Sequence, residues 1–210
     1  MAETYEITGE PKAGGFIQQH ELDLIETLPT APTVFDVGAS IGDFTQAVLE
    51  RRPDARVLAF EPQEEAQRQL RQRFGSRITV LGALGRAAET RELYSDVPGS
   101  QLGTFLPRNI PEVQMRSQGA VEVSTLADVC RAHDVEHIDL LKLDCEGFEY
   151  EVLFGAAYML DHVGLLYWEM MESDPHPYET GVTMEDYWRL LGSRFAVTPM
   201  NAIHCKAVRR

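Results

Sequence analysis

Residues 34–44 read VFDVGASIGDF, and this stretch decides the fold. A short apolar strand, expected over residues 33–37, runs into a turn that contains Gly38 and Gly42, and a helix is expected over residues 44–51. Glycine lets a ligand approach the backbone because no Cβ stands in the way. In an open α/β sheet, ligands bind in the crevice at the carboxyl ends of the strands. The stretch therefore predicts a ligand site directly after the first strand.

The spacing of this turn indicates which kind of ligand it suits. The residues follow D-x-G-x-x-x-G, whereas a dinucleotide-binding turn prefers G-x-G-x-x-G and sets a pyrophosphate against a helix N-terminus. Asp36 precedes the turn instead, which favours a ligand with a cationic amino-acid end and no phosphate. A glycine turn taken alone is equally compatible with a tight strand–helix connection.

Outward from this turn, strand-like and helix-like stretches alternate along the chain. Near-continuous apolar strands separated by helices predict an α/β fold, with one parallel sheet covered on both faces. Further strands are expected over residues 56–60, 78–81, 138–143 and 163–170, and further helices over 14–28, 64–74, 126–133, 150–160 and 184–191. Residues 195–198 and 202–208 are expected to close the sheet as an antiparallel hairpin. Residues 85–119, rich in Gly and Pro, are expected to be irregular, either an inserted lid or a loop.

Length and composition limit the classes of function. The 210 residues, 44% of them hydrophobic, favour one globular domain over residues 33–210, preceded by an N-terminal helix or lid over residues 1–32. No apolar run reaches the ~18 residues that a membrane span needs, and the polar N-terminus predicts no secretory signal, so a cytoplasmic location is expected. A net charge of −14 argues against nucleic acid and anionic membranes as partners. The three cysteines form no C-x-x-C pair, which argues against a zinc site.

A carboxylate at the end of the second strand supplies another binding signal. Glu61 and Pro62 follow the strand at residues 56–60, and Glu61 stands 19 residues after Gly42. An acid at this place in such a sheet binds a ribose diol, because a carboxylate accepts hydrogen bonds from both hydroxyls. The alternative is a glutamate that faces solvent, and the glycine turn favours the ribose.

The stretch IDLLKLDCEGFE at residues 138–149 brings acids to the same edge of the sheet. Asp144 and Glu146 follow the strand, and Lys142 interrupts its apolar run, where a buried charge needs an acidic partner. The acids could contact a cofactor, act as a general base or bind a metal, or they could simply complement a helix dipole. We expect Asp144 to be functional and Glu149 to be structural.

Together these motifs resemble the FkbM-type methyltransferases, a branch of the class I S-adenosylmethionine enzymes. The matching stretches cover about two-thirds of the chain and occur in the family's order; they are FDVGASIGDFT (35–45), AFEP (59–62), ALG (83–85), STLADV (124–129) and IDLLKLDCEGFEYEVLFGA (138–156). Family members usually carry Asn or His at the position of Ser40, and Val at that of Cys145.

The resemblance implies a Rossmann-like, doubly wound sheet of seven strands with an antiparallel last strand, and S-adenosylmethionine as the cofactor. By resemblance, the cofactor-binding residues have distinct roles: Gly38 and Gly42 border the methionine part, Asp36 supports their loop, Glu61 holds the ribose, Ala83 and Leu84 border the adenine, and Asp144 lies near the amino group or the acceptor. Ser40 and Pro62 belong to the same motifs and are expected beside the cofactor. The family mostly methylates hydroxyls of sugars, polyketides and other natural products.

Methyl transfer to a hydroxyl needs a group that takes the proton. The expected catalytic residues are Asp144, Glu169 near the end of the fifth strand, His20 on the N-terminal helix and His176 on the loop after the fifth strand. Glu169, Asp144 and Glu146 could instead hold a hard cation, but we assign no metal.

Two alternatives remain at this stage: a nicotinamide-dependent oxidoreductase, and a non-catalytic protein that keeps the cofactor pocket. The expected partner is a small-molecule acceptor, and a homo-oligomer stays open. The loop at residues 172–183 is expected to cover the acceptor.

Overall fold

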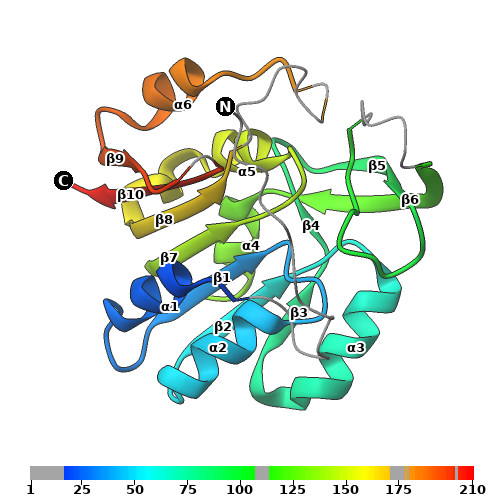
Figure 1. Cartoon of the computed structure of the whole chain (residues 1–210), viewed down its shortest axis with the longest axis horizontal. Coiled ribbons are helices and arrows are strands. Elements are labelled where there is room, and N and C mark those ends of the chain that lie inside the picture. Colours follow the sequence, from blue (N-terminus) through cyan, green and yellow to red (C-terminus); the bar gives the residue numbers. More distant parts are fainter. Residues whose placement is uncertain (1–16, 107–113, 171–177, 179, 202) are drawn as a thin grey trace, which may run out of the picture.

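The computed structural model describes residues 17–106, 114–170, 178, 180–201 and 203–210. Its main sheet has seven strands in the order β3-β2-β1-β7-β8-β10-β9 (Figure 1). Five run parallel: β1 (Thr33–Val37), β2 (Arg56–Phe60), β3 (Thr79–Leu81), β7 (Ile138–Leu143) and β8 (Val163–Glu169). The last strand, β10 (His204–Arg209), runs antiparallel between β8 and β9 (Phe195–Pro199). The predicted seven-stranded sheet with an antiparallel last strand is confirmed.

Helices cover both faces of this sheet, each over its own buried cluster of apolar side chains. On one face lie α1 (Gln19–Glu26), α2 (Asp43–Arg51) and α3 (Glu64–Phe74), which contribute Ile25, Val48 and Leu70 to the core. On the other lie α4 (Leu126–Ala132), α5 (Glu149–Gly155) and α6 (Met184–Leu191). Because α1 buries side chains in the same cluster as α2, the N-terminal helix packs onto the sheet as part of its core.

Most helix boundaries follow the capping chemistry in the sequence. The N–H of Asp128 donates to Thr125 Oγ1 at 3.1 Å, and Thr183 with Asp186 forms a capping box. Helix α1 begins at Gln19, later than predicted, because Glu21 accepts a hydrogen bond from the Gln18 N–H at 2.8 Å and fixes the start there.

Two predicted elements need correction. The helix expected over residues 150–160 ends as an α-helix at Gly155, and a 3-10 segment, η2 (Ala157–His162), continues it. A Cβ at Gly155 would lie 2.0 Å from the carbonyl oxygen of Gly85, so the chain packs backbone against backbone at this end. A shorter 3-10 turn, η1 (Gly75–Arg77), follows α3.

The region expected to be irregular contains a second sheet, of three strands in the order β4-β6-β5. Its strands are β4 (Ala83–Leu84), β5 (Glu89–Ser95) and β6 (Arg116–Ser124), and β5 pairs antiparallel with β6. Most side chains of β5 and β6 are exposed, and polar and charged residues outnumber apolar ones in both, so neither strand has the apolar pattern of the main sheet. This sheet lies beside the carboxyl ends of β2 and β3 and positions residues 96–105 (Figure 1).

Among the described residues, no helix has both the length and the apolar character that crossing a membrane requires. None of the described cysteines, Cys130, Cys145 and Cys205, forms a disulfide.

Candidate functional site

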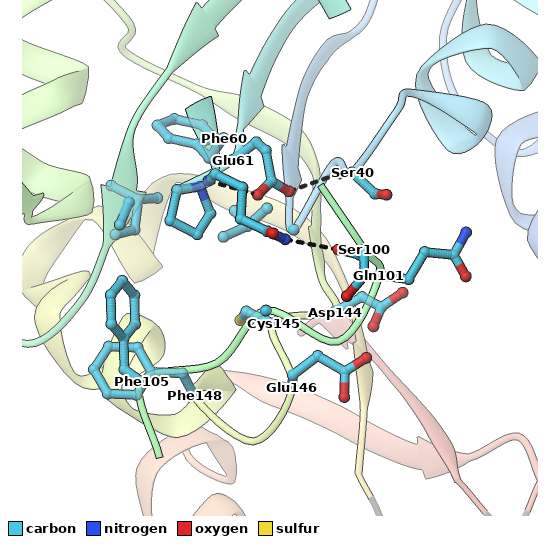
Figure 2. A pocket seen from close by; sticks show the side chains of 17 residues that line it. Ser40, Phe60, Glu61, Ser100, Gln101, Phe105, Asp144, Cys145, Glu146 and Phe148 are labelled. Atoms are coloured by element: carbon cyan, nitrogen blue, oxygen red, sulfur yellow. Dashed lines mark hydrogen bonds between the residues drawn. The ribbon is translucent and has the colours of Figure 1, made fainter. Parts of the chain in front are cut away.

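A cavity with about 510 Å³ of open space lies at the carboxyl ends of β1, β2 and β7. Gly38, Ser40, Glu61, Pro62, Ala83, Leu84 and Asp144 line it, as the sequence predicts for a cofactor site, and other lining residues come from the segment at 100–105. Figure 2 shows Gln101, Asp144 and Glu146 on one side of the cavity and Phe105 and Phe148 on the other. The cavity therefore has a polar side and an aromatic side.

The turn after β1 is held by backbone hydrogen bonds to β2. The N–H groups of Gly38 and Ala39 both donate to the Phe60 carbonyl oxygen, at 2.9 and 3.0 Å. Gly38 has φ +75°, and a Cβ there would lie 1.7 Å from the Asp144 carbonyl oxygen. Glycine is thus required because the neighbouring backbone, rather than a ligand, occupies the space of a side chain. Ser40 has φ +48°, and its buried hydroxyl has no hydrogen-bond partner among the described residues.

Two of the residues expected at the cofactor site lie outside the cavity lining. Gly42, with φ +90°, is the N-cap of α2, and a Cβ there would lie 2.4 Å from the Phe74 ring on α3. This glycine lets α2 and α3 pack closely, so its expected contact with the ligand is not found. Asp36 is fully buried behind the turn, where the Thr45 hydroxyl donates to it at 2.7 Å.

Lys142 connects Asp36 to the cavity. Its Nζ lies 3.2 Å from Asp36 Oδ1, 3.4 Å from Asp144 Oδ2 and 3.2 Å from the Gly38 carbonyl oxygen. Burial disfavours the Lys142 ammonium, but the charges of Asp36 and Asp144 outweigh that penalty and raise its pKa. The lysine is therefore a cation that joins β1, the glycine turn and the end of β7.

Glu61 closes the cavity from the end of β2. Its two carboxylate oxygens accept backbone N–H groups, one from Ser40 at 2.9 Å and one from Gln63 at 2.8 Å (Figure 2). Burial raises the pKa of Glu61 to about 7, against the lowering effect of these two hydrogen bonds. The carboxyl group thus fixes the turn of Ser40 while it faces the cavity.

The turn between β7 and α5 carries the next two acids. Glu149 is buried and accepts hydrogen bonds from the N–H groups of Cys145 at 2.7 Å and Gly147 at 3.3 Å, which is the structural role we expected. Glu146 has φ +55°, a strained conformation for this residue type. The Thr104 hydroxyl donates to its carbonyl oxygen at 2.8 Å, and the Tyr178 hydroxyl donates to its carboxylate.

A second cavity, of about 860 Å³, adjoins the first. Gly38, Ser40, Gln101, Asp144 and Glu146 line both cavities. The rest of the second cavity is lined by Ile17, Glu21, Ala39, Asp43, Phe44, Lys142 and Glu169. The expected catalytic residues Asp144 and Glu169 thus face the same space.

Glu169 lies in a strongly acidic setting at the end of β8. Burial, together with the charges of Asp144, Glu146 and Glu149, raises the pKa of Glu169 to about 9. Oxygens of Asp144, Glu146 and Glu169 lie within 4.8 Å of one another, close enough to share a proton or to surround a cation. Without a cation, the raised pKa keeps Glu169 protonated near neutral pH.

The raised pKa predicts how stability depends on pH. Because folded Glu169 binds its proton more tightly than unfolded Glu169, whose pKa is near 4.5, the carboxyl destabilises the fold progressively as pH rises from about 4.5 to about 9. We expect Glu169→Gln, which cannot ionise, to lose less stability than the wild type between pH 5 and 9 in urea denaturation. If the free energy of unfolding changes with pH equally in the two proteins, Glu169 is ionised in the folded state.

The two histidines expected near the acceptor are placed differently. His20 lines neither cavity; its Nε2 lies 2.8 Å from the Tyr167 hydroxyl. His176 lies outside the described residues, as does most of the loop expected to cover the acceptor. From that loop, Tyr178 is described, and its ring packs against Gly147.

Sequence reasoning missed several lining residues. Gln101 and Phe105 lie in the region expected to be irregular, and Phe148 belongs to a matched motif that suggested no role for it. Glu21, on α1, faces the second cavity. Gln18 and Glu21 have the three-residue spacing of a capping box. This spacing was the available signal for the start of α1, and the start of the helix determines where Glu21 points.

A family model and several known methyltransferases match this chain. The family model for the methyltransferase FkbM domain matches residues 36–195. The methyltransferase sdnD of Sordaria araneosa is 30% identical, over 63% of this chain and 63% of its own length. The 2-O-methyltransferase NoeI of Sinorhizobium fredii is 28% identical, over 77% of this chain and 72% of its own. The chain thus spans less than two-thirds of sdnD.

A solved structure shows the same fold. The methyltransferase FkbM from Methylobacillus flagellatus has a TM-score of 0.56 and 20% identity, over 85% of this chain and 44% of its own. The family model matches most of the chain and includes the turn after β1, the acid after β2 and the rim after β7. The chain therefore belongs to the FkbM methyltransferase family.

Proposed function

We propose that this protein transfers the methyl group of S-adenosylmethionine to a hydroxyl of a small molecule. The observation that carries the proposal is the pair of adjoining cavities, which share the rim formed by Gly38, Ser40, Gln101, Asp144 and Glu146. A cofactor in the first cavity would present its reactive end at this rim, and an acceptor in the second would meet it there.

The residues of the first cavity fit the cofactor. Glu61 would hold the ribose hydroxyls, and Ala83 and Leu84 would border the adenine. The partnerless hydroxyl of Ser40 offers a further hydrogen bond, and Asp144 offers a carboxylate for the amino group. When bound, the cofactor supplies an electrophilic methyl group on a sulfonium.

The chain's own contribution is to orient the acceptor and to take its proton. Asp144 and Glu169 face the second cavity, and the raised pKa of Glu169 leaves the pair with one proton and one negative charge near neutral pH. Asp144, as the carboxylate of the pair, accepts the hydroxyl proton while protonated Glu169 donates a hydrogen bond. Holding an acceptor in line with the methyl group supplies most of the remaining catalysis.

The lining also suggests the class of acceptor. Carboxyl and amide groups such as Glu146, Glu21 and Gln101 suit a molecule with several hydroxyls. The relative NoeI is named as a 2-O-methyltransferase, which supports oxygen as the methylated atom. We therefore propose a hydroxylated sugar, polyketide or similar natural product as the acceptor, and no nucleic acid or membrane as a partner.

Calorimetry combined with turnover tests the proposed function. We expect the protein to bind S-adenosylmethionine and S-adenosylhomocysteine but not NAD in isothermal titration. Radiolabelled S-adenosylmethionine should label an acceptor within a screen of methyl glycosides, polyols, phenols and hydroxylated polyketides. Binding without any transfer would favour the non-catalytic alternative, and transfer to nitrogen in amine acceptors would correct the assignment of oxygen.

Glu61→Gln should weaken cofactor binding. The variant loses a charged acceptor for the ribose and sets an amide N–H₂ against one of two backbone N–H groups. We expect a loss of about 1–3 kcal/mol, or roughly 5- to 150-fold in Kd for S-adenosylhomocysteine. The matched control is Glu64→Gln, on the exposed side of α3, which should bind normally. Equal affinities of the two variants would remove Glu61 from the ribose site.

A further inference from the structure

A row of buried polar side chains crosses the sheet beneath α1. Asp36 on β1, Lys142 on β7 and Tyr167 on β8 are register partners, so they lie side by side on one face. All three are almost completely buried, in the cluster that α1 covers with Leu24 and Ile25. Polar groups at such positions need hydrogen-bond partners, and Tyr167 finds one in His20, which belongs to α1.

Tyr167 joins the acceptor cavity to a histidine outside it. Its hydroxyl lies 2.8 Å from His20 Nε2, and the carboxyl of the next residue on α1, Glu21, lies near enough to act on it electrostatically. Burial first, and then the charge of Glu21, raises the pKa of Tyr167, so the hydroxyl stays protonated and can pass a proton only as it receives one. The tyrosine therefore stands between a carboxyl group and an imidazole.

The two ends of this chain of groups open into different spaces. Glu21 lines the second cavity together with Asp144 and Glu169, and burial raises its pKa. His20 lines a separate groove, which Thr27, Pro29, Met200 and Lys206 also border.

We propose that Glu21, Tyr167 and His20 form a proton outlet from the acceptor cavity to the groove, a role that rests on the proposed methyl transfer. In the reaction the S–CH3 bond breaks, the O–CH3 bond forms and the acceptor's hydroxyl proton moves to Asp144. From Asp144 the proton crosses the shared cavity to the Glu21 carboxylate. Glu21 then passes a proton to the Tyr167 oxygen as the Tyr167 proton moves to His20 Nε2, and His20 releases a proton to solvent.

Such an outlet has a physical purpose in this cavity. After each transfer the acceptor cavity holds one more proton, and Asp144 must lose it before it can serve again. The groups that face Glu21 are Lys142, His20 and Asp144; those that face Tyr167 are Glu21, Asp144 and Glu169, with His204 stacked on the ring at 5.4 Å. Burial lowers the pKa of His204 to about 4, and it also lies against His20, so it stays neutral and does not compete for the proton.

Three variants interrupt the outlet at successive points: Glu21→Gln, Tyr167→Phe and His20→Ala. The acceptor that reacts fastest in the screen above serves as the probe. We expect each variant to lower kcat by roughly 10- to 100-fold, at the low end of the range for a positioned proton-transfer group, with affinity for S-adenosylhomocysteine unchanged. The solvent deuterium isotope effect on kcat should rise, because proton release becomes slower than transfer. Added imidazole should restore His20→Ala but not Tyr167→Phe.

Matched controls separate an outlet from a structural role. His137→Ala and Tyr158→Phe change exposed residues of the same types elsewhere, and both should keep the wild-type rate. If the three variants are slow but show no larger isotope effect, and imidazole does not restore His20→Ala, then the three residues only pack the structure. That result would overturn the outlet. Wild-type rates in all three would overturn it directly. If the wild type itself transfers no methyl group, the proposed function is wrong, and the outlet, which rests on it, is overturned as well.

Discussion

Lys142→Met should lower the free energy of unfolding by about 3–5 kcal/mol, the usual cost of removing one partner of a buried ion pair. Methionine fills a similar volume but leaves the Asp36 carboxylate, which is fully buried, without its cation. Thr45 would remain as the donor to Asp36, and a single hydroxyl does not balance a buried charge. Urea denaturation followed by circular dichroism measures the loss.

A second substitution shows whether the charge is the cause. In the double variant Asp36→Asn, Lys142→Met, no buried charge is left at this point, so much of the stability should return. Lys206→Met, on β10, which β8 separates from β7, and only half-buried, is the matched single variant and should change stability by about 0.5 kcal/mol or less. A loss below about 1 kcal/mol for Lys142→Met would mean that Asp36 is protonated in the fold, and the ion pair would have to be withdrawn.

The residues that sequence predicts well at this site are those whose position follows from the strands. Gly38, Glu61 and Asp144 each come directly after a parallel strand, and parallel strands that alternate with helices bring their carboxyl ends to one edge. The spacing of strand-end residues therefore predicts that they meet. Lys142 was predictable for a related reason, since a charge within an apolar strand must find an acid nearby.

What sequence did not predict depends on tertiary packing. Glu21 lines the second cavity because α1 packs in one cluster with Tyr167. The capping-box spacing of Gln18 and Glu21 predicts where the helix begins but not which strand the helix packs against. Strands β5 and β6 were missed because most of their side chains are exposed, and Leu93 and Val123 are their only buried apolar side chains. The packing of Gly42 against α3 was also missed, because α3 follows later in the chain and the turn motif does not specify it.

The raised pKa values of several carboxyl groups reduce the negative charge of the site near neutral pH. Glu61, Glu149 and Glu169 all have a raised pKa, chiefly because burial penalises their charged forms. Lys142 supplies one cation among them. The site is therefore much less negative near neutral pH than its carboxyl groups suggest, and protonated carboxyls can donate hydrogen bonds to an acceptor. Such shifted carboxyls also leave protons to be moved during turnover.

Asp144→Asn should reduce kcat for methyl transfer by roughly 10²- to 10⁴-fold, the range for a positioned general base. Asparagine keeps the shape of the side chain, which is 44% exposed, and can still accept a hydrogen bond from Lys142. It cannot take a proton, so the reaction loses the group that receives the hydroxyl hydrogen. Since Asp144 also faces the cofactor cavity, we expect Kd for S-adenosylhomocysteine to rise as well, by about tenfold or less.

The pH profile distinguishes a base from a binding residue. In the wild type, kcat should fall as pH rises toward about 9, because Glu169 then loses the proton with which it donates a hydrogen bond to the acceptor. In Asp144→Asn, kcat should be low at every pH, and the fall should move to lower pH because the Asp144 charge no longer helps to raise the pKa of Glu169. Asp134→Asn, an exposed substitution at φ +51° before β7, is the control and should keep the wild-type profile, since asparagine accepts that backbone conformation readily. A wild-type kcat that instead rises as pH approaches 9 would assign the base to Glu169 and leave Asp144 as a group that orients the acceptor.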